Sequence, residues 1–120
     1  MKKLLVVDDE KNIRTLYKEV FEKDGYEVIL ASTGKDCLEK IKNTSGLDLL
    51  VLDIKLPDIN GMEILAELSK AKNKIPVILN SAYVGYENDP NAWLAEKYII
   101  KSGDLSELKE KVKEVLGGKK

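Results

Sequence analysis

Two short apolar runs, neither alternating with polar residues, constrain the fold of this chain most strongly. The first ends in Asp8 and Asp9, and the second, at residues 49–52, ends in Asp53. Such runs are typical of strands covered on both faces, as in a parallel sheet. If the two strands are parallel neighbours, three carboxylates meet at one edge. Such a cluster repels itself unless a cation lies in it or one carboxyl is protonated, so the sequence predicts a divalent metal, a shared proton or both.

The rest of the chain alternates between strand and helix patterns. Together with the two runs above, we predict strands at residues 3–8, 26–31, 48–53, 75–81 and 97–101. Apolar residues at helical spacing predict helices at residues 11–23, 35–42, 62–70 and 90–96, and a last helix that Asp104 caps and Gly117 ends. Five strands and five helices in alternation indicate an α/β fold, a doubly wound parallel sheet with helices on both faces.

The composition limits the classes of function. With 120 residues, the chain is expected to form a single domain over residues 1–120. Its 20 basic and 21 acidic residues give no general attraction to nucleic acid or membranes. Histidine is absent, which excludes Ser-His-Asp and Cys-His catalysis and most zinc sites. The lone cysteine suits a reducing cytosol, and we see neither a membrane span nor room for a signal peptide before the first strand. The sequence therefore predicts a cytoplasmic protein.

The ends of the predicted strands carry the chemistry. In open α/β sheets, ligands bind beyond the carboxyl ends of the strands at the point where the strand order reverses. For the order 2-1-3-4-5, that point lies between the strands that end in Asp8, Asp9 and Asp53. Ser81 ends the fourth strand and Lys101 ends the fifth, so both are expected to face the same pocket. Several carboxylates suit Mg²⁺ or Mn²⁺, a lysine adds a second positive point, and a carboxylate can itself accept a phosphoryl group. This set of groups favours phosphoryl transfer.

At this point the chain resembles the receiver domain of bacterial two-component response regulators, over essentially its whole length. The matching segments are VDDE at residues 7–10, DIKLPDING at residues 53–61, SAY at residues 81–83 and YIIK at residues 98–101. The resemblance implies a flavodoxin-like fold. It also implies a stand-alone signalling switch of the chemotaxis or phosphorelay type rather than an enzyme, with no catalysis beyond its own phosphotransfer and slow autodephosphorylation.

The resemblance assigns a role to each acidic residue. Asp53 accepts the phosphoryl group from a histidine kinase or a histidine phosphotransfer protein. Asp8, Asp9 and Asp53 hold Mg²⁺ together with the backbone carbonyl of Lys55. The protein is expected to be a monomer or a weak, phosphorylation-linked dimer that binds no nucleic acid directly. The sequence identifies no downstream target.

The resemblance also implies how phosphorylation is reported. Lys101 and Ser81 bind phosphoryl oxygens, and the movement of Ser81 frees Tyr98 to turn inward. The face formed by the fourth helix, fifth strand and fifth helix then repacks. Two residues near the mouth of the site are expected to modulate it: Lys55 by shielding the phosphoryl group from water, and Tyr83 by crowding its approach.

Departures from the family pattern cluster between the fourth strand and the last helix. The family has Lys-Pro with a cis bond where this chain has Lys101 and Ser102, so we expect the loop to take another path. The segment before Lys101 is about two residues shorter than usual, which predicts an altered fourth helix. Asn80 replaces an apolar strand residue and needs a partner if it is buried. Trp93 is expected to pack on the short helix.

Three other functions compete with the receiver hypothesis. An aspartate-nucleophile phosphohydrolase of the haloacid dehalogenase type usually has a second aspartate two residues after the nucleophile, where this chain has Lys55. A flavodoxin-like FMN binder needs a glycine-rich phosphate loop after the first strand, but Asp8 and Asp9 would repel a phosphate there. A receiver-like scaffold with impaired switching is the third alternative.

Overall fold

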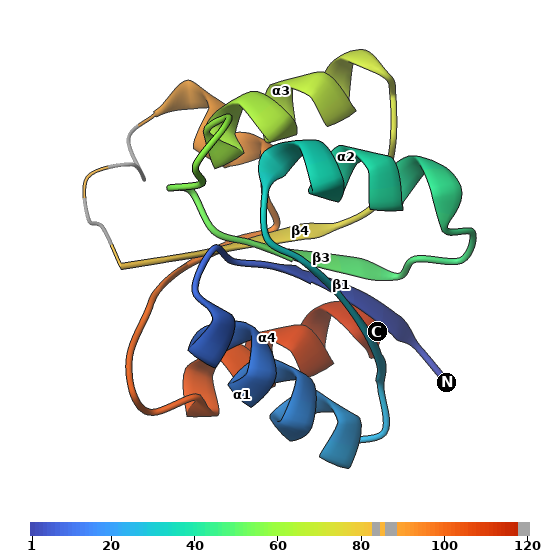
Figure 1. Cartoon of the computed structure of the whole chain (residues 1–120), viewed down its shortest axis with the longest axis vertical. Coiled ribbons are helices and arrows are strands. Elements are labelled where there is room, and N and C mark those ends of the chain that lie inside the picture. Colours follow the sequence, from blue (N-terminus) through green and yellow to red (C-terminus); the bar gives the residue numbers. More distant parts are fainter. Residues whose placement is uncertain (83–84, 86–88, 118–120) are drawn as a thin grey trace.

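The apolar runs of the sequence pair as one parallel sheet in the computed structural model, which describes residues 1–82, 85 and 89–117 (Figure 1). The strands are β1 (Lys3–Val7), β2 (Glu27–Ala31), β3 (Leu49–Leu52), β4 (Val77–Ser81) and β5 (Lys97–Ile100). They pair in the order β2-β1-β3-β4-β5, and every neighbouring pair is parallel. The predicted strand order is confirmed, with strand ends within two residues of the predicted ones.

Four α-helices cover the sheet within the described part of the chain. They are α1 (Lys11–Lys23), α2 (Gly34–Asn43), α3 (Gly61–Lys70) and α4 (Ser106–Leu116). Figure 1 shows α2 and α3 on one face and α1 and α4 on the other. The prediction that Asp104 caps α4 is wrong, because Leu105 is the N-cap and makes no side-chain cap hydrogen bond. The Asp104 carboxylate instead accepts the Ser106 N–H from one residue before the cap. None of these helices is both long and apolar enough to cross a membrane.

The prediction of a fifth α-helix at residues 90–96 is wrong. This segment forms a 3₁₀ helix, η2 (Pro90–Leu94), which begins as predicted with Asp89 as cap and Pro90 in first position. The backbone is already extended again at Ala95. Short helices depend on burying an apolar face for their stability, and Ala92 is the one fully buried residue of η2. Trp93 does not pack as predicted, since 81% of it is exposed.

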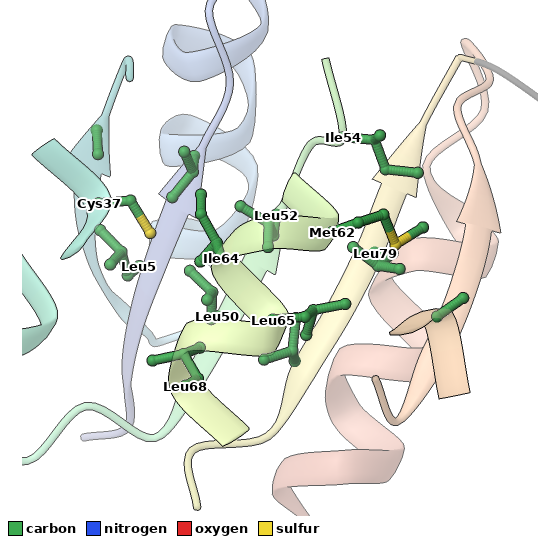
Figure 2. Packing of buried hydrophobic residues seen from close by; sticks show 14 residues of the cluster. Leu5, Cys37, Leu50, Leu52, Ile54, Met62, Ile64, Leu65, Leu68 and Leu79 are labelled. Carbon is green, nitrogen blue, oxygen red and sulfur yellow. The ribbon is translucent and has the colours of Figure 1, made fainter. Parts of the chain in front are cut away.

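The core consists of two apolar layers, one on each face of the sheet. Alternate residues of the buried strands enter different layers, which is why the runs show no polar alternation. Leu50 and Leu52 of β3 pack with α2 and α3, as Figure 2 shows, whereas Leu49 and Val51 pack with α1 and α4. Cys37 lies in the first layer, fully buried as predicted, and burial raises the pKa of its thiol to about 12. The strands β1, β3 and β4 are therefore buried up to their last residues, whereas Ile100 at the end of β5 is exposed.

Polar contacts fix the loop between β3 and α3. The Asp58 carboxylate accepts hydrogen bonds from the backbone N–H groups of Gly34 and Lys35, at 2.8 Å each, and so caps the start of α2. Asn60 caps α3 in the same way, by accepting the Met62 N–H at 2.7 Å. The loop that follows Asp53 is therefore tied to two helices.

Candidate functional site

The carboxyl ends of β1 and β3 bring the three predicted aspartates together. Val7 of β1 is in register with Leu52 of β3, so the residues that follow them are also neighbours. The carboxylate oxygens of Asp8, Asp9 and Asp53 come within 4.8 Å of one another. Asp8 and Asp53 are buried, with 2% and 5% exposed, whereas Asp9 is exposed. The predicted meeting of three carboxylates at one sheet edge is confirmed.

Lys101 reaches this cluster from the end of β5. Its ammonium nitrogen lies 2.6 Å from Asp8 Oδ2 and 3.1 Å from Asp53 Oδ2. Burial by itself would lower the pKa of Lys101, but the hydrogen bonds and charges of Asp8 and Asp53 outweigh burial and raise it. The backbone N–H of Lys101 donates to the Ser81 carbonyl at 2.7 Å. Lys101 therefore links the acidic cluster to the end of β4.

Asp53 has one oxygen that is paired and one that is not. Oδ2 accepts a hydrogen bond from Lys101, while Oδ1 is buried and has no hydrogen-bond partner among the residues that the structure describes. Burial raises the pKa of the Asp53 carboxyl, Lys101 opposes this shift, and the Asp8 charge adds to it. Buried polar atoms without a partner are uncommon in proteins. Three carboxylates around the Lys101 ammonium, with a buried oxygen that no described residue pairs, fit a site for an additional cation such as Mg²⁺.

A cleft of about 270 Å³ opens onto the cluster. Its lining residues are Asp9, Glu10, Asp53, Lys55, Ala82 and Lys101. The exposed Lys55 thus lies at the mouth of the site, where the sequence placed it. Glu10 and Ala82 were not predicted as lining residues, although each directly follows a predicted one.

The two predicted switch residues are not among the residues that line the cleft. Ser81 is fully buried at the end of β4, and Ala82 takes its place in the lining of the cleft. Tyr98 is half-buried on β5, in register with Leu79, and packs against the apolar layer on the α3 side. Tyr83 lies outside the described residues.

One contact at the edge escaped the sequence analysis. The Arg14 guanidinium of α1 donates to the backbone carbonyl of Asp8 at 2.8 Å. Arg14 follows Asp8 by six residues, and only the turn of the chain into α1 brings the two together. The bond holds the end of β1 against the first helix.

The loop after Lys101 takes a trans path. No peptide bond in the described part of the chain is cis, which agrees with the expectation from Ser102. The Ser102 hydroxyl accepts the Asp104 N–H at 3.0 Å and so turns the chain toward α4.

Comparison with known proteins places this geometry in context. A family model described as "Response regulator receiver domain" matches residues 4–113. Sporulation initiation phosphotransferase F of Bacillus subtilis is 34% identical over 95% of this chain and 93% of its own length. The alkaline phosphatase synthesis transcriptional regulatory protein PhoP of the same organism is 38% identical over 96% of this chain, which spans 48% of the length of PhoP.

Solved structures of a response regulator are also similar to this chain. Response regulator protein TrrA of Thermotoga maritima, crystallised in complex with Mg²⁺-BeF, superposes with a TM-score of 0.92 and 45% identity, covering 97% of this chain and 100% of TrrA. TrrA in complex with the histidine kinase ThkA superposes with a TM-score of 0.89 at the same identity, over 97% of this chain and 99% of TrrA.

Proposed function

Because this chain belongs to the response regulator receiver domain family, we propose that it is a signalling switch that accepts a phosphoryl group on Asp53 from a phosphohistidine donor. One observation carries the assignment of Asp53. Its Oδ1 atom is buried and has no hydrogen-bond partner in the described part of the chain, and it lies beside two further carboxylates and Lys101 at a cleft open to solvent. We also propose that residues 1–120 act as a single receiver domain, which the one continuous sheet supports.

Asp8, Asp9 and Asp53, with the backbone carbonyl of Lys55, are the groups that would hold Mg²⁺ or Mn²⁺. The three side chains are hard oxygen donors within 4.8 Å of one another, and TrrA binds Mg²⁺-BeF. When bound, the metal offsets negative charge that would otherwise oppose the approach of a phosphoryl group.

The chain's own residues perform the transfer. A carboxylate oxygen of Asp53 forms the new O–P bond while the P–N bond of the phosphohistidine breaks, and its electron pair returns to the donor's imidazole. The Lys101 ammonium, already 3.1 Å from Asp53, holds a phosphoryl oxygen. Catalysis is confined to this transfer and to slow hydrolysis of the acyl phosphate, so the protein signals rather than turns over a substrate.

The new charge is the signal. Phosphorylation adds about −1.5 to −2 charge next to Lys101. Ser81, whose carbonyl accepts the Lys101 N–H, moves so that its hydroxyl binds another phosphoryl oxygen. Tyr98, on β5 between η2 and α4, then turns inward. The face made by η2, β5 and α4 is the two-state element that this charge biases.

The donor is a histidine kinase or a histidine phosphotransfer protein, and the complex of TrrA with ThkA supports a kinase. The cytoplasmic location and the oligomeric state, a monomer or a weak phosphorylation-linked dimer, were both predicted from the sequence and stay predictions.

Labelling with acetyl phosphate and Mg²⁺ tests the acceptor. Intact-protein mass spectrometry is expected to find one phosphoryl group on the wild type, none after the metal is chelated, and none on Asp53→Asn. Asp48→Asn is the matched control, because Asp48 is at the opposite end of the same strand run and binds the Lys3 N–H instead. Labelling of Asp53→Asn at the wild-type rate would refute the assignment.

Two further outcomes separate the alternatives. A wild type that binds Mg²⁺ but takes up no phosphoryl group would indicate a scaffold with impaired switching, and sustained phosphate release would indicate a phosphohydrolase. The switch itself is read by NMR, where beryllofluoride with Mg²⁺ is expected to shift the amide signals of Ser81, Tyr98 and α4.

A further inference from the structure

A buried hydrogen bond lies directly beside the acidic cluster. Asn80 of β4, with 3% exposed, donates its side-chain N–H to the Tyr17 hydroxyl of α1 at 2.8 Å. Tyr17 is 2% exposed, and its ring contacts the edge of Phe21 with ring centroids 6.2 Å apart. The partner that the sequence required for a buried Asn80 is therefore found 63 positions away.

The sheet register places Asn80 next to the proposed phosphoacceptor. Leu52 of β3 is in register with Leu79 of β4. The next residues along these strands are Asp53 and Asn80, so they are neighbours too. Side chains alternate between the faces of a sheet, and Ile78 of β4 packs in the layer beneath α1 and α4 together with Tyr17. Asn80 therefore points to the same face as Ile78, with Asp53 beside it on the adjacent strand.

Electrostatics connect the Tyr17 hydroxyl to the cluster. Burial raises the pKa of this hydroxyl, and the hydrogen bond from Asn80 opposes that shift. The charges of Lys101, Asp8 and Asp53 also act on it. The hydroxyl is thus within electrostatic range of all three charged groups.

A small pocket connects the same hydrogen bond to the loop after Lys101. It has a volume of about 170 Å³, and Tyr17, Asn80 and Ser102 are among its lining residues. Ser102 stands where the family pattern has proline, so the loop here lacks a rigid ring at the residue after Lys101. The Tyr17–Asn80 pair and Ser102 therefore line the same pocket.

We propose that Tyr17 and Asn80 are positioning residues, which fix the end of β4 against α1 and thereby keep Ser81 and Lys101 aligned with Asp53. The proposal rests on the function proposed above. It explains why a polar pair occupies an otherwise apolar layer, where two apolar side chains would fold equally well. The pair joins the helix that follows Asp8 and Asp9 to the residue that precedes Ser81.

A double-mutant cycle separates positioning from stability. Tyr17→Phe and Asn80→Leu each leave one buried polar group unpaired, so each single variant is expected to lose thermal stability. The double variant removes both polar groups and is expected to regain most of the thermal stability that each single variant loses. The rate of labelling by acetyl phosphate is expected to fall about tenfold in both single variants and to remain about tenfold low in the double variant, since small displacements at a reacting centre are costly.

Ile78→Val is the matched control, because Ile78 is buried on the same face of the same strand. It is expected to lose some stability and to keep the wild-type labelling rate. A double variant that regains both stability and labelling rate would show that the pair is only structural, and would overturn the inference while the proposed function stands. An unlabelled wild type would overturn the proposed function, and this inference with it.

Discussion

The two sides of the candidate site are held in different ways. On the β1–β3 side, the strands are buried to their last residues, and the loop after Asp53 is tied to α2 through Asp58. On the β4–β5 side, the described part of the connection contains a short 3₁₀ helix, in which Trp93 and Leu94 are 81% and 47% exposed. Among the described residues, the proposed phosphoacceptor therefore follows a fully buried strand, whereas the proposed reporting face carries exposed apolar side chains. Elements that change conformation are drawn from the less stable parts of a fold.

Lys101 joins the two sides, so its removal is expected to have the largest effect on stability. Lys101→Ala leaves the buried carboxylates of Asp8 and Asp53 without their positive partner. Breaking a buried pair costs several kcal/mol, and because this site opens to solvent we expect the free energy of unfolding in urea to fall by about 2–3 kcal/mol. Added Mg²⁺ is expected to restore part of the loss.

The matched control is Lys97→Ala on the same strand. Lys97 pairs with Glu114 at 3.1 Å on the surface, and exposed pairs contribute about 0–1 kcal/mol. Equal losses for the two lysine variants would mean that Lys101 does not neutralise the cluster.

Two glycines test the difference in packing directly. A Cβ at Gly61, on the β3 side, would lie 2.5 Å from the Asp53 carbonyl oxygen and 2.9 Å from the Ile54 Cα. Both are backbone atoms, so Gly61→Ala is expected to destabilise the protein by about 2 kcal/mol and to slow labelling.

A Cβ at Gly103, on the β5 side, would meet no atom within 4 Å. Gly103→Ala is therefore expected to change the unfolding free energy by less than about 0.5 kcal/mol. Thermal denaturation measures the loss of stability in both variants. Losses of similar size would contradict the proposed difference in packing between the two sides of the site.

Lys55 is expected to set the lifetime of the acyl phosphate. It is exposed at the mouth of the cleft, where its ammonium can shield the phosphoryl group from attacking water. Lys55→Asn is expected to shorten the lifetime about threefold, which corresponds to about 0.6 kcal/mol in the barrier to hydrolysis. Decay of the labelled protein after removal of acetyl phosphate measures it. Lys70→Asn, on α3 and outside the cleft lining, should leave the lifetime unchanged, and an unchanged or longer lifetime for Lys55→Asn would count against shielding.

Substitution of Asp58 is expected to have the smallest effect on stability, and this effect depends on pH. Backbone N–H groups, first that of Lys35, lower the pKa of its carboxyl. A folded-state pKa below the unfolded value of about 3.9 adds stability above that pH, and the gain is lost as the pH falls through the folded pKa. Asp58→Asn should therefore be less stable than the wild type at neutral pH, with a gap that closes on acidification below about pH 4.

Asp104, on the other side of the site, provides the comparison. Ser106 lowers the pKa of the Asp104 carboxyl, first through its side chain and then through its backbone N–H, so Asp104→Asn should show the same sign with a smaller gap. Urea midpoints across this pH range measure both variants, and a gap for Asp58→Asn that persists in acid would contradict the assignment.

Local patterns in the sequence predicted much of this molecule. Unalternated apolar runs predicted buried parallel strands because both faces of such strands must be covered. The runs that end in Asp8 and Asp53 predicted a carboxylate cluster, because adjacent parallel strands end at the same edge. A polar Asn80 in an apolar strand required a hydrogen-bond partner if it is buried, because an unpaired amide is costly to bury.

Only the tertiary structure decided the remaining features, since each depends on residues far apart in the chain. Helical spacing at residues 90–96 could not distinguish an α-helix from the 3₁₀ helix η2, because the difference rests on how much apolar surface the neighbouring elements cover. The same lack of cover leaves Trp93 exposed. The spacing of apolar residues did not identify Tyr17 as the partner of Asn80, nor Asp58 as the acceptor of the first N–H groups of α2. Periodicity indicates which face of a helix or strand a residue occupies, but not which distant residue it contacts.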